Sequence, residues 1–134
     1  QQINVPQEVE LLLYLSATDT IITTDPLRLK QVINNLINNA IKFTSKGAVT
    51  LGYKQNNDQV SIFVKDTGSG IDEDKINRIF ERFYKGDNFV QGTGLGLAIS
   101  HTIIEHLKGT ITVTSKVGEG SCFTIQHPVK KMGY

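Results

Sequence analysis

The stretch DPLRLKQVINNLINNAIKF, residues 25–43, predicts the longest helix of the chain and, through its single apolar face, a second layer for that helix to cover. Asp25 followed by Pro26 is typical of a helix start, because the carboxylate can cap free N–H groups and proline suits the first turn. After them, apolar residues recur every three or four positions, as one face of a helix requires. They are Leu29, Val32, Ile33, Leu36, Ile37, Ala40 and Phe43.

The flanking segments indicate a sheet as the second layer. Strands are expected at residues 9–15, 21–24, 48–54, 59–66, 110–117 and 121–129, where β-forming residues alternate between turn signals. Asp72 should cap a short helix that reaches residue 83, and residues 95–107 should form a long helix that ends before Gly109. This order predicts an α+β fold: a two-layer α/β sandwich with a mixed, mostly antiparallel sheet and about three helices on one face.

Composition indicates one globular domain over residues 1–134. Apolar residues make up 39% of the chain, and the net charge of +1 gives no reason to expect a nucleic-acid partner. The longest apolar run, residues 11–15, is too short to span a bilayer, and the start QQINVPQ suggests a fragment of a longer protein. The single cysteine, Cys122, indicates a reducing, cytoplasmic location, and the alternating residues around it predict a buried side chain.

Four asparagines in the first helix need an explanation, because asparagine is a mediocre helix former. At about 100° per residue, Asn35 and Asn39 lie along one edge of the apolar stripe, while Asn34 and Asn38 point toward solvent. An amide oxygen is a suitable ligand for Mg²⁺. Lys42 and Phe43, on the same edge, could meet a phosphate and a base. Taken alone, this edge also fits an ordinary solvated helix face.

Two glycine-rich stretches, DTGSG (66–70) and GTGLG (92–96), follow an apolar strand and precede a helix, respectively. Asp66 could accept a hydrogen bond from an exocyclic amine such as that of adenine, and the glycines allow close backbone approach. Free N–H groups at the start of the helix expected over residues 95–107 could bind phosphate. A turn and a plain loop remain alternatives. The P-loop pattern requires Lys and then Ser or Thr after its second glycine, but Tyr53 follows Gly52. The Rossmann pattern requires a strand before its glycines, but a loop is expected before Gly92.

Five motifs occur in order: NLINNAIKF, DTGSGI, IFERFY, GTGLGLAIS and GEGSCF. Together they resemble the N, G1, F, G2 and terminal glycine boxes of the catalytic, ATP-binding domain of bacterial two-component sensor histidine kinases. That family has the Bergerat fold, which it shares with the ATPase domains of gyrase, mismatch-repair proteins and a heat-shock chaperone. The resemblance covers residues 25–125, nearly the whole chain.

The resemblance implies a role for each matching residue. Asn39 would bind Mg²⁺ through its amide oxygen, and Asn35 stands where gyrase-type ATPases carry a water-activating glutamate. Phe80 and Phe83 would anchor a mobile ATP lid over residues 72–93. The implied catalytic residues are Asn35, Asn39, Lys42 and Lys85. The implied ATP-binding residues are Asn35, Asn39, Lys42, Phe43, Asp66, Gly68, Gly70, Ile71, Phe83, Lys85, Thr93, Gly94, Leu95, Gly96, Leu97 and Ser121.

By the same resemblance, the domain would transfer the γ-phosphoryl group of Mg-ATP to a histidine on a separate dimerisation domain, upstream of a response regulator receiver domain. Its parent would be a homodimer anchored in the inner membrane, and the isolated domain a monomer. The phosphoacceptor motif is absent, and His101, His106 and His127 fit structural or surface roles. Alternatives are a non-catalytic nucleotide-sensing module, a gyrase-type ATPase and an anti-sigma-type serine kinase.

Overall fold

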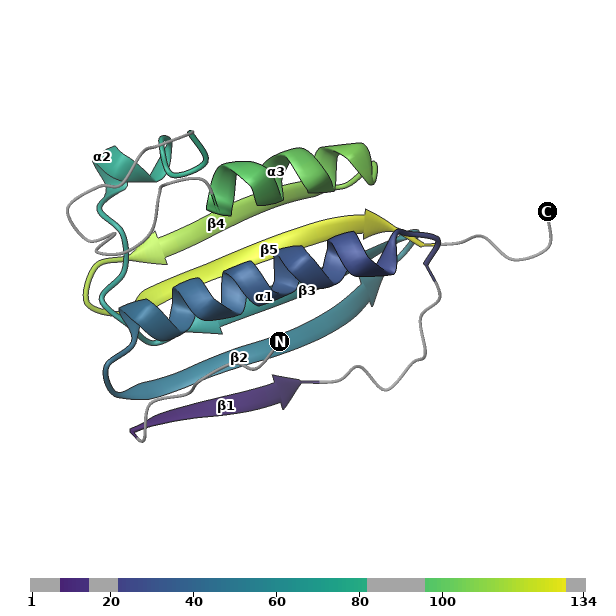
Figure 1. Cartoon of the computed structure of the whole chain (residues 1–134). Helices are drawn as coiled ribbons and strands as arrows, with labels where there is room; N and C mark the ends of the chain where they lie inside the picture. Colours follow the sequence, from purple (N-terminus) through teal and green to yellow (C-terminus); the bar gives the residue numbers. More distant parts are fainter. Residues whose placement is uncertain (1–7, 15–21, 82–95, 130–134) are drawn as a thin grey trace.

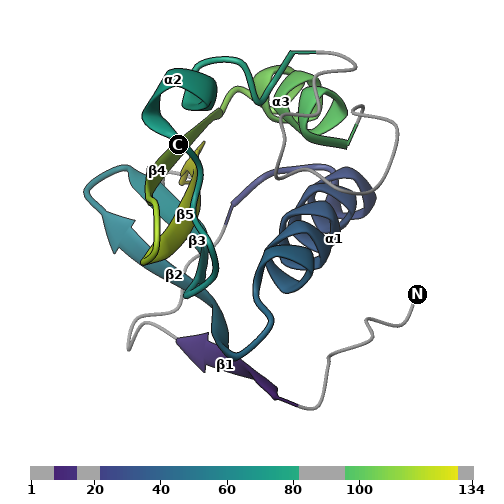
Figure 2. The same ribbon diagram turned by 90° about the vertical axis from the view of Figure 1, so that its left-hand side faces the viewer.

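A computed structural model describes residues 8–14, 22–81 and 96–129 of the chain, which form a sheet with helices on one face (Figures 1 and 2). The strands are β1 (Val9–Tyr14), β2 (Gly47–Asn56), β3 (Gln59–Asp66), β4 (Thr110–Lys116) and β5 (Gly120–Pro128). Their order in the sheet is β1-β2-β3-β5-β4. β1 runs parallel to β2, and the other neighbouring pairs are antiparallel. The predicted mixed α+β sandwich is therefore confirmed.

The helices are α1 (Pro26–Phe43), α2 (Glu73–Ile76) and α3 (Gly96–His106). α1 begins where the sequence predicts, because the Asp25 side chain accepts a hydrogen bond of 3.2 Å from the Arg28 N–H. α1 and α3 lie over the same face of the sheet, and α2 packs beside β4 (Figure 2). No helix in the described part of the chain is long and apolar enough to cross a membrane.

The core lies between the sheet and the two long helices. α1 contributes its predicted apolar stripe, and the sheet contributes alternate residues of β2, β3 and β5. Burial of each large aliphatic side chain stabilises the fold by about 1.5–3 kcal/mol. The most fully buried apolar side chains are Val32, Leu36, Val49, Val64, Ile79, Ile104 and Ile125.

Three local predictions are wrong. The described residues 22–24 pair with no strand in the sheet and instead lead directly into the Asp25 cap. α2 is only four residues long, and the Asp72 side chain forms an ion pair with Lys75 at 3.4 Å instead of capping the helix. Cys122 is partly exposed, because strand alternation places it on the opposite face from the buried Phe123.

Candidate functional site

The candidate site lies at one end of the sandwich, where β3 and α1 end and β5 and α3 begin (Figure 1). Asp66 is the last residue of β3 and pairs in register with Ser121 on β5. Asp66 as a whole residue is 3% exposed. The Oδ1 atom accepts hydrogen bonds from the Gly68 N–H at 2.9 Å and from the Ser121 N–H at 3.3 Å. Since both bonds use Oδ1, Oδ2 can accept a further hydrogen bond.

The electrostatics of Asp66 match this geometry. Burial raises the pKa of the carboxyl above its ordinary value, and the hydrogen bonds from Gly68 and Ser121 partly oppose that shift. A buried acceptor of this kind discriminates among ligands, because a ligand without a matching donor leaves it unpaired at a cost of about 1–3 kcal/mol.

The loop after Asp66 is held between the end of α1 and the start of β5. A Cβ at Gly68 would overlap the Phe43 carbonyl oxygen, which also accepts a hydrogen bond of 3.2 Å from the Ser69 N–H. Gly70 has a φ of +78°, a conformation that glycine adopts without strain. Both glycines therefore pack closely against the backbone of the same chain, and their expected approach to a ligand stays a prediction.

Two further predicted residues are placed by a serine that sequence reasoning missed. The Ser115 hydroxyl on β4 lies 2.8 Å from the Ile71 N, which donates to it, and 2.7 Å from the Ser121 Oγ. Ile71 and Ser121 are both buried. The available signal was the pairing of β4 with β5, which sets Ser115 directly opposite Ser121.

The asparagine edge of α1 faces α3. Asn35 donates a hydrogen bond of 3.2 Å from Nδ2 to the Ser100 Oγ. One turn later, the Nδ2 atom of Asn39 is buried and has no hydrogen-bond partner among the described residues. Asn34 and Asn38 were expected to point toward solvent, but both are half-buried. The exposed face of α1 is therefore narrower than the spacing of about 100° per residue predicts.

The remaining predicted site residues divide into two groups. In the described part of the chain, Lys42 is exposed at the end of α1, while α3 begins with the exposed Gly96 and the buried Leu97. The Phe80 ring packs against Phe123 with a centroid distance of 6.2 Å, so the described residues 77–81 after α2 are attached to the core. The predicted residues Phe83, Lys85, Thr93, Gly94 and Leu95, together with most of the predicted lid, lie outside the described residues.

The described residues form a two-layer α/β sandwich with a mixed five-stranded sheet, and the family match identifies the class of this fold as an ATP-binding domain. The profile of the family described as "Histidine kinase-, DNA gyrase B-, and HSP90-like ATPase" matches residues 24–131, and the chain belongs to this family. Within it, the chain has the sequence and fold of the ATP-binding catalytic domain of a sensor histidine kinase, which confirms the resemblance drawn from the five motifs.

Curated relatives are similar over about four fifths of the chain. Sensor histidine kinase RcsC of Escherichia coli K12 is 46% identical over 109 residues, which cover 78% of this chain and 12% of RcsC. The aerobic respiration control sensor protein ArcB of the same organism is 41% identical over 110 residues, which cover 78% of this chain and 14% of ArcB. The chain therefore spans only a small part of the length of these relatives.

Solved structures agree with the fold. Full-length ShkA in complex with AMPPNP has a TM-score of 0.85 and 33% identity, and the match covers 94% of this chain and 27% of ShkA. The nucleotide-free catalytic domain of histidine kinase ThkA has a TM-score of 0.79 and 28% identity, and the match covers 90% of this chain and 80% of that domain.

Proposed function

We propose that this domain binds Mg-ATP and transfers its γ-phosphoryl group to a histidine on the dimerisation domain of its parent protein, from which a response regulator receiver domain is then phosphorylated. The observation that carries this proposal is the buried Asp66 carboxylate, whose Oδ2 can accept a hydrogen bond from the adenine amine. The lone cysteine supports a reducing, cytoplasmic location.

The α1 asparagines fit a bound Mg²⁺ ion. The Asn39 amide is half-buried, and its buried Nδ2 lacks a partner among the described residues, as expected for a group that meets a ligand. Its oxygen and nitrogen exchange places by rotation of the amide, so the oxygen can face the ion. When bound, Mg²⁺ would be held by Asn39 with Asn35 beside it, and would neutralise charge on the phosphates.

The contribution of the chain is positioning and electrostatics. Lys42 stands exposed at the end of α1, where its ammonium would approach the phosphates. The N-terminal end of α3 would offer N–H groups and the positive end of the helix dipole. Asn35 carries no carboxylate that could activate water, and this supports phosphoryl transfer over hydrolysis.

A phosphotransfer assay tests this function. The chain is incubated with γ-labelled ATP, Mg²⁺ and the separately produced dimerisation domain of the parent. We expect acid-labile label on that domain, and none when its acceptor histidine is replaced by alanine. Acid-stable label would instead indicate a serine kinase, and phosphate release without the partner would indicate a hydrolytic ATPase. Neither label transfer nor phosphate release, from a chain that binds ATP in titration calorimetry, would indicate a non-catalytic nucleotide-sensing module.

The metal assignment has its own test. Asn39→Ala should raise the Mg²⁺ concentration needed for half-maximal ATP binding by about tenfold, because a metal ligand is lost. Titration calorimetry at several Mg²⁺ concentrations measures this change. Asn34→Ala, on the same helix and also half-buried, is the matched control and should leave it unchanged. An equal Mg²⁺ dependence in both variants would remove Asn39 from the site.

A further inference from the structure

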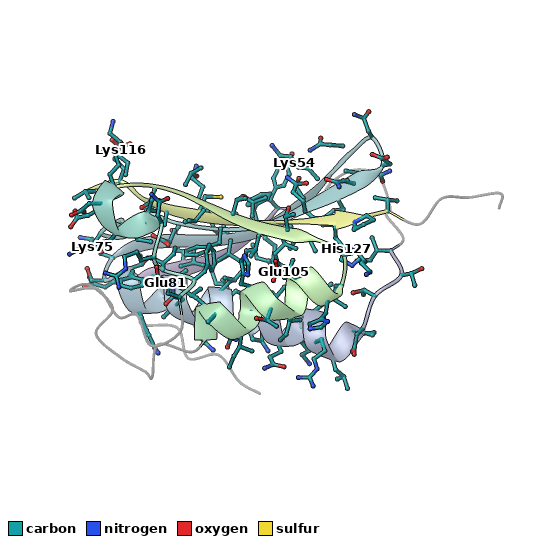
Figure 3. The ribbon with its side chains drawn as sticks, turned by 90° about the horizontal axis from the view of Figure 1, so that it is seen from above. Lys54, Lys75, Glu81, Glu105, Lys116 and His127 are labelled. Atoms are coloured by element: carbon teal, nitrogen blue, oxygen red, sulfur yellow. The ribbon has the colours of Figure 1, made fainter. Side chains whose placement is uncertain are left out.

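The sheet has a second face that no described helix covers. α1 and α3 lie on one side of the sheet, and the Lys54 and Lys116 side chains project from the other side (Figure 3). This outer face contains a hollow of about 610 Å³, within the size range of ligand-binding clefts. Its lining includes Tyr14, Thr50, Lys54, Phe63, Lys65 and Thr124.

One wall of the hollow is an ordered aromatic pair. The rings of Tyr14 and Phe63 lie 6.0 Å apart at an interplanar angle of 44°. Gly52 makes room for this pair, because a Cβ there would contact both Tyr14 and the end of the Phe63 ring. The Lys54 ammonium lies 5.8 Å from the centre of the Tyr14 ring, a cation–π distance. The wall therefore presents aromatic surface beside a positive charge.

The floor of the hollow is polar and internally hydrogen-bonded. The buried Ser61 hydroxyl donates to the Gln126 Oε1 at 2.9 Å, across the β3–β5 pair. Asn56 reaches the same hydroxyl from β2 at 3.5 Å. These polar groups already have hydrogen-bond partners, so the floor needs none from a ligand. The charged side chains at the rim therefore decide which ligand fits.

The rim is positively charged. At the outward positions of the described strands, the cations are Lys54, Lys65 and Lys116, and the carboxylate is Glu10. Lys116 forms an ion pair with Glu119 at 3.2 Å. Lys54 and Lys65 take part in none of the ion pairs in the described part of the chain, so their charges remain available to a partner.

We infer that this outer face is a docking surface for an acidic polypeptide segment that carries an aromatic side chain. Carboxylates of the segment pair with Lys54 and Lys65, and its ring packs against Tyr14 and Phe63. The surface lies on the opposite face of the sheet from α1 and α3, so it is independent of the proposed nucleotide site. RcsC and ArcB extend far beyond the matched region, and the parent protein is a natural source of such a segment.

A peptide titration tests the inference. The ¹⁵N-labelled 134-residue chain is titrated with a synthetic peptide of alternating Glu and Tyr, followed by amide chemical shifts. We expect shifts at outward residues of β2, β3 and β5 and none on α1. The double variant Lys54→Glu/Lys65→Glu should weaken binding at least about fivefold, since each reversed charge turns attraction into repulsion. Lys30→Glu, at an exposed lysine on α1, is the charge-reversal control away from the outer face and should bind as before.

Three results would overturn the inference. The first is unchanged affinity in the double variant, which should stay folded because both lysines are exposed, as dispersed amide signals would verify. The second is equal binding of a peptide with Gln in place of Glu. The third is reproduction of the same shifts by inorganic phosphate alone, which would mean that the face takes a simple anion. Because ATP is absent from the titration, none of these outcomes depends on the proposed kinase function.

Discussion

Asp66→Asn separates the binding role of the carboxylate from its structural role. Asparagine has nearly the same size, and its Oδ1 can still accept the backbone hydrogen bonds from Gly68 and Ser121. The other end of the side chain changes from an acceptor to an NH₂ donor. That donor would face the adenine amine, which is also a donor, so the variant loses the proposed recognition and keeps the local fold.

The magnitude follows from the cost of an unpaired buried group. Loss of the acceptor should cost about 1.5 kcal/mol or more of binding free energy, so the Kd for ATP should rise at least tenfold. Titration calorimetry with ATP and Mg²⁺ measures this change. The control is Asp58→Asn, at an exposed position in the β2–β3 turn, which should leave the Kd unchanged. An unchanged Kd in Asp66→Asn would refute the adenine role of Asp66.

The same variant should not lose stability at neutral pH. Burial raises the folded-state pKa of Asp66 above 3.8, so the folded chain holds this proton more tightly than the unfolded chain. The stability from that proton is present below 3.8 and is lost as the pH rises through the folded-state pKa. The asparagine side chain does not ionise, so the variant avoids the loss of stability that ionisation of the buried carboxyl causes. Its free energy of unfolding in urea at pH 7 should therefore equal or exceed that of the wild type, and the difference between the two proteins should shrink as the pH falls. A variant clearly less stable at pH 7 would contradict the dominance of desolvation.

Three further substitutions test the packing around the site. Gly68→Ala should destabilise the fold by about 1–3 kcal/mol in urea unfolding, because the new Cβ overlaps the Phe43 carbonyl oxygen; full stability would mean that the loop moves freely. Ser100→Ala should lower the free energy of unfolding by about 1–3 kcal/mol, because it leaves the Asn35 amide without its buried partner. A urea-unfolding midpoint equal to that of the wild type would contradict this expectation. Ile104→Ala should cost about 2–5 kcal/mol, since Ile104 is fully buried, and a loss below 1 kcal/mol would argue against its core position.

Local patterns in the sequence determined most of the secondary structure and the family. The apolar spacing after Asp25 predicted α1, and the alternation after Gln59 predicted β3, because helices and strands repeat over a few neighbouring residues. The same reasoning failed at residues 22–24, which have β-forming side chains but no strand to pair with in the described sheet. It also failed at Cys122, which lies in an alternating apolar stretch but whose own side chain is partly exposed. Strand formation requires a neighbouring strand with free backbone groups, which no local pattern specifies.

Contacts between distant parts of the chain were decided only by the tertiary structure. The bond from Asn35 to Ser100 joins residues 65 apart, and the bond from Ser121 to Asp66 joins residues 55 apart. The parallel pairing of β1 with β2 was equally absent from the sequence patterns, and the contact of Ser115 with Ile71 depended on how the loop after β3 meets β4. Residue type and spacing along the chain show which groups are chemically suited to a site. Which of them meet depends on strand register and helix packing, and these are set by the burial of the whole core at once.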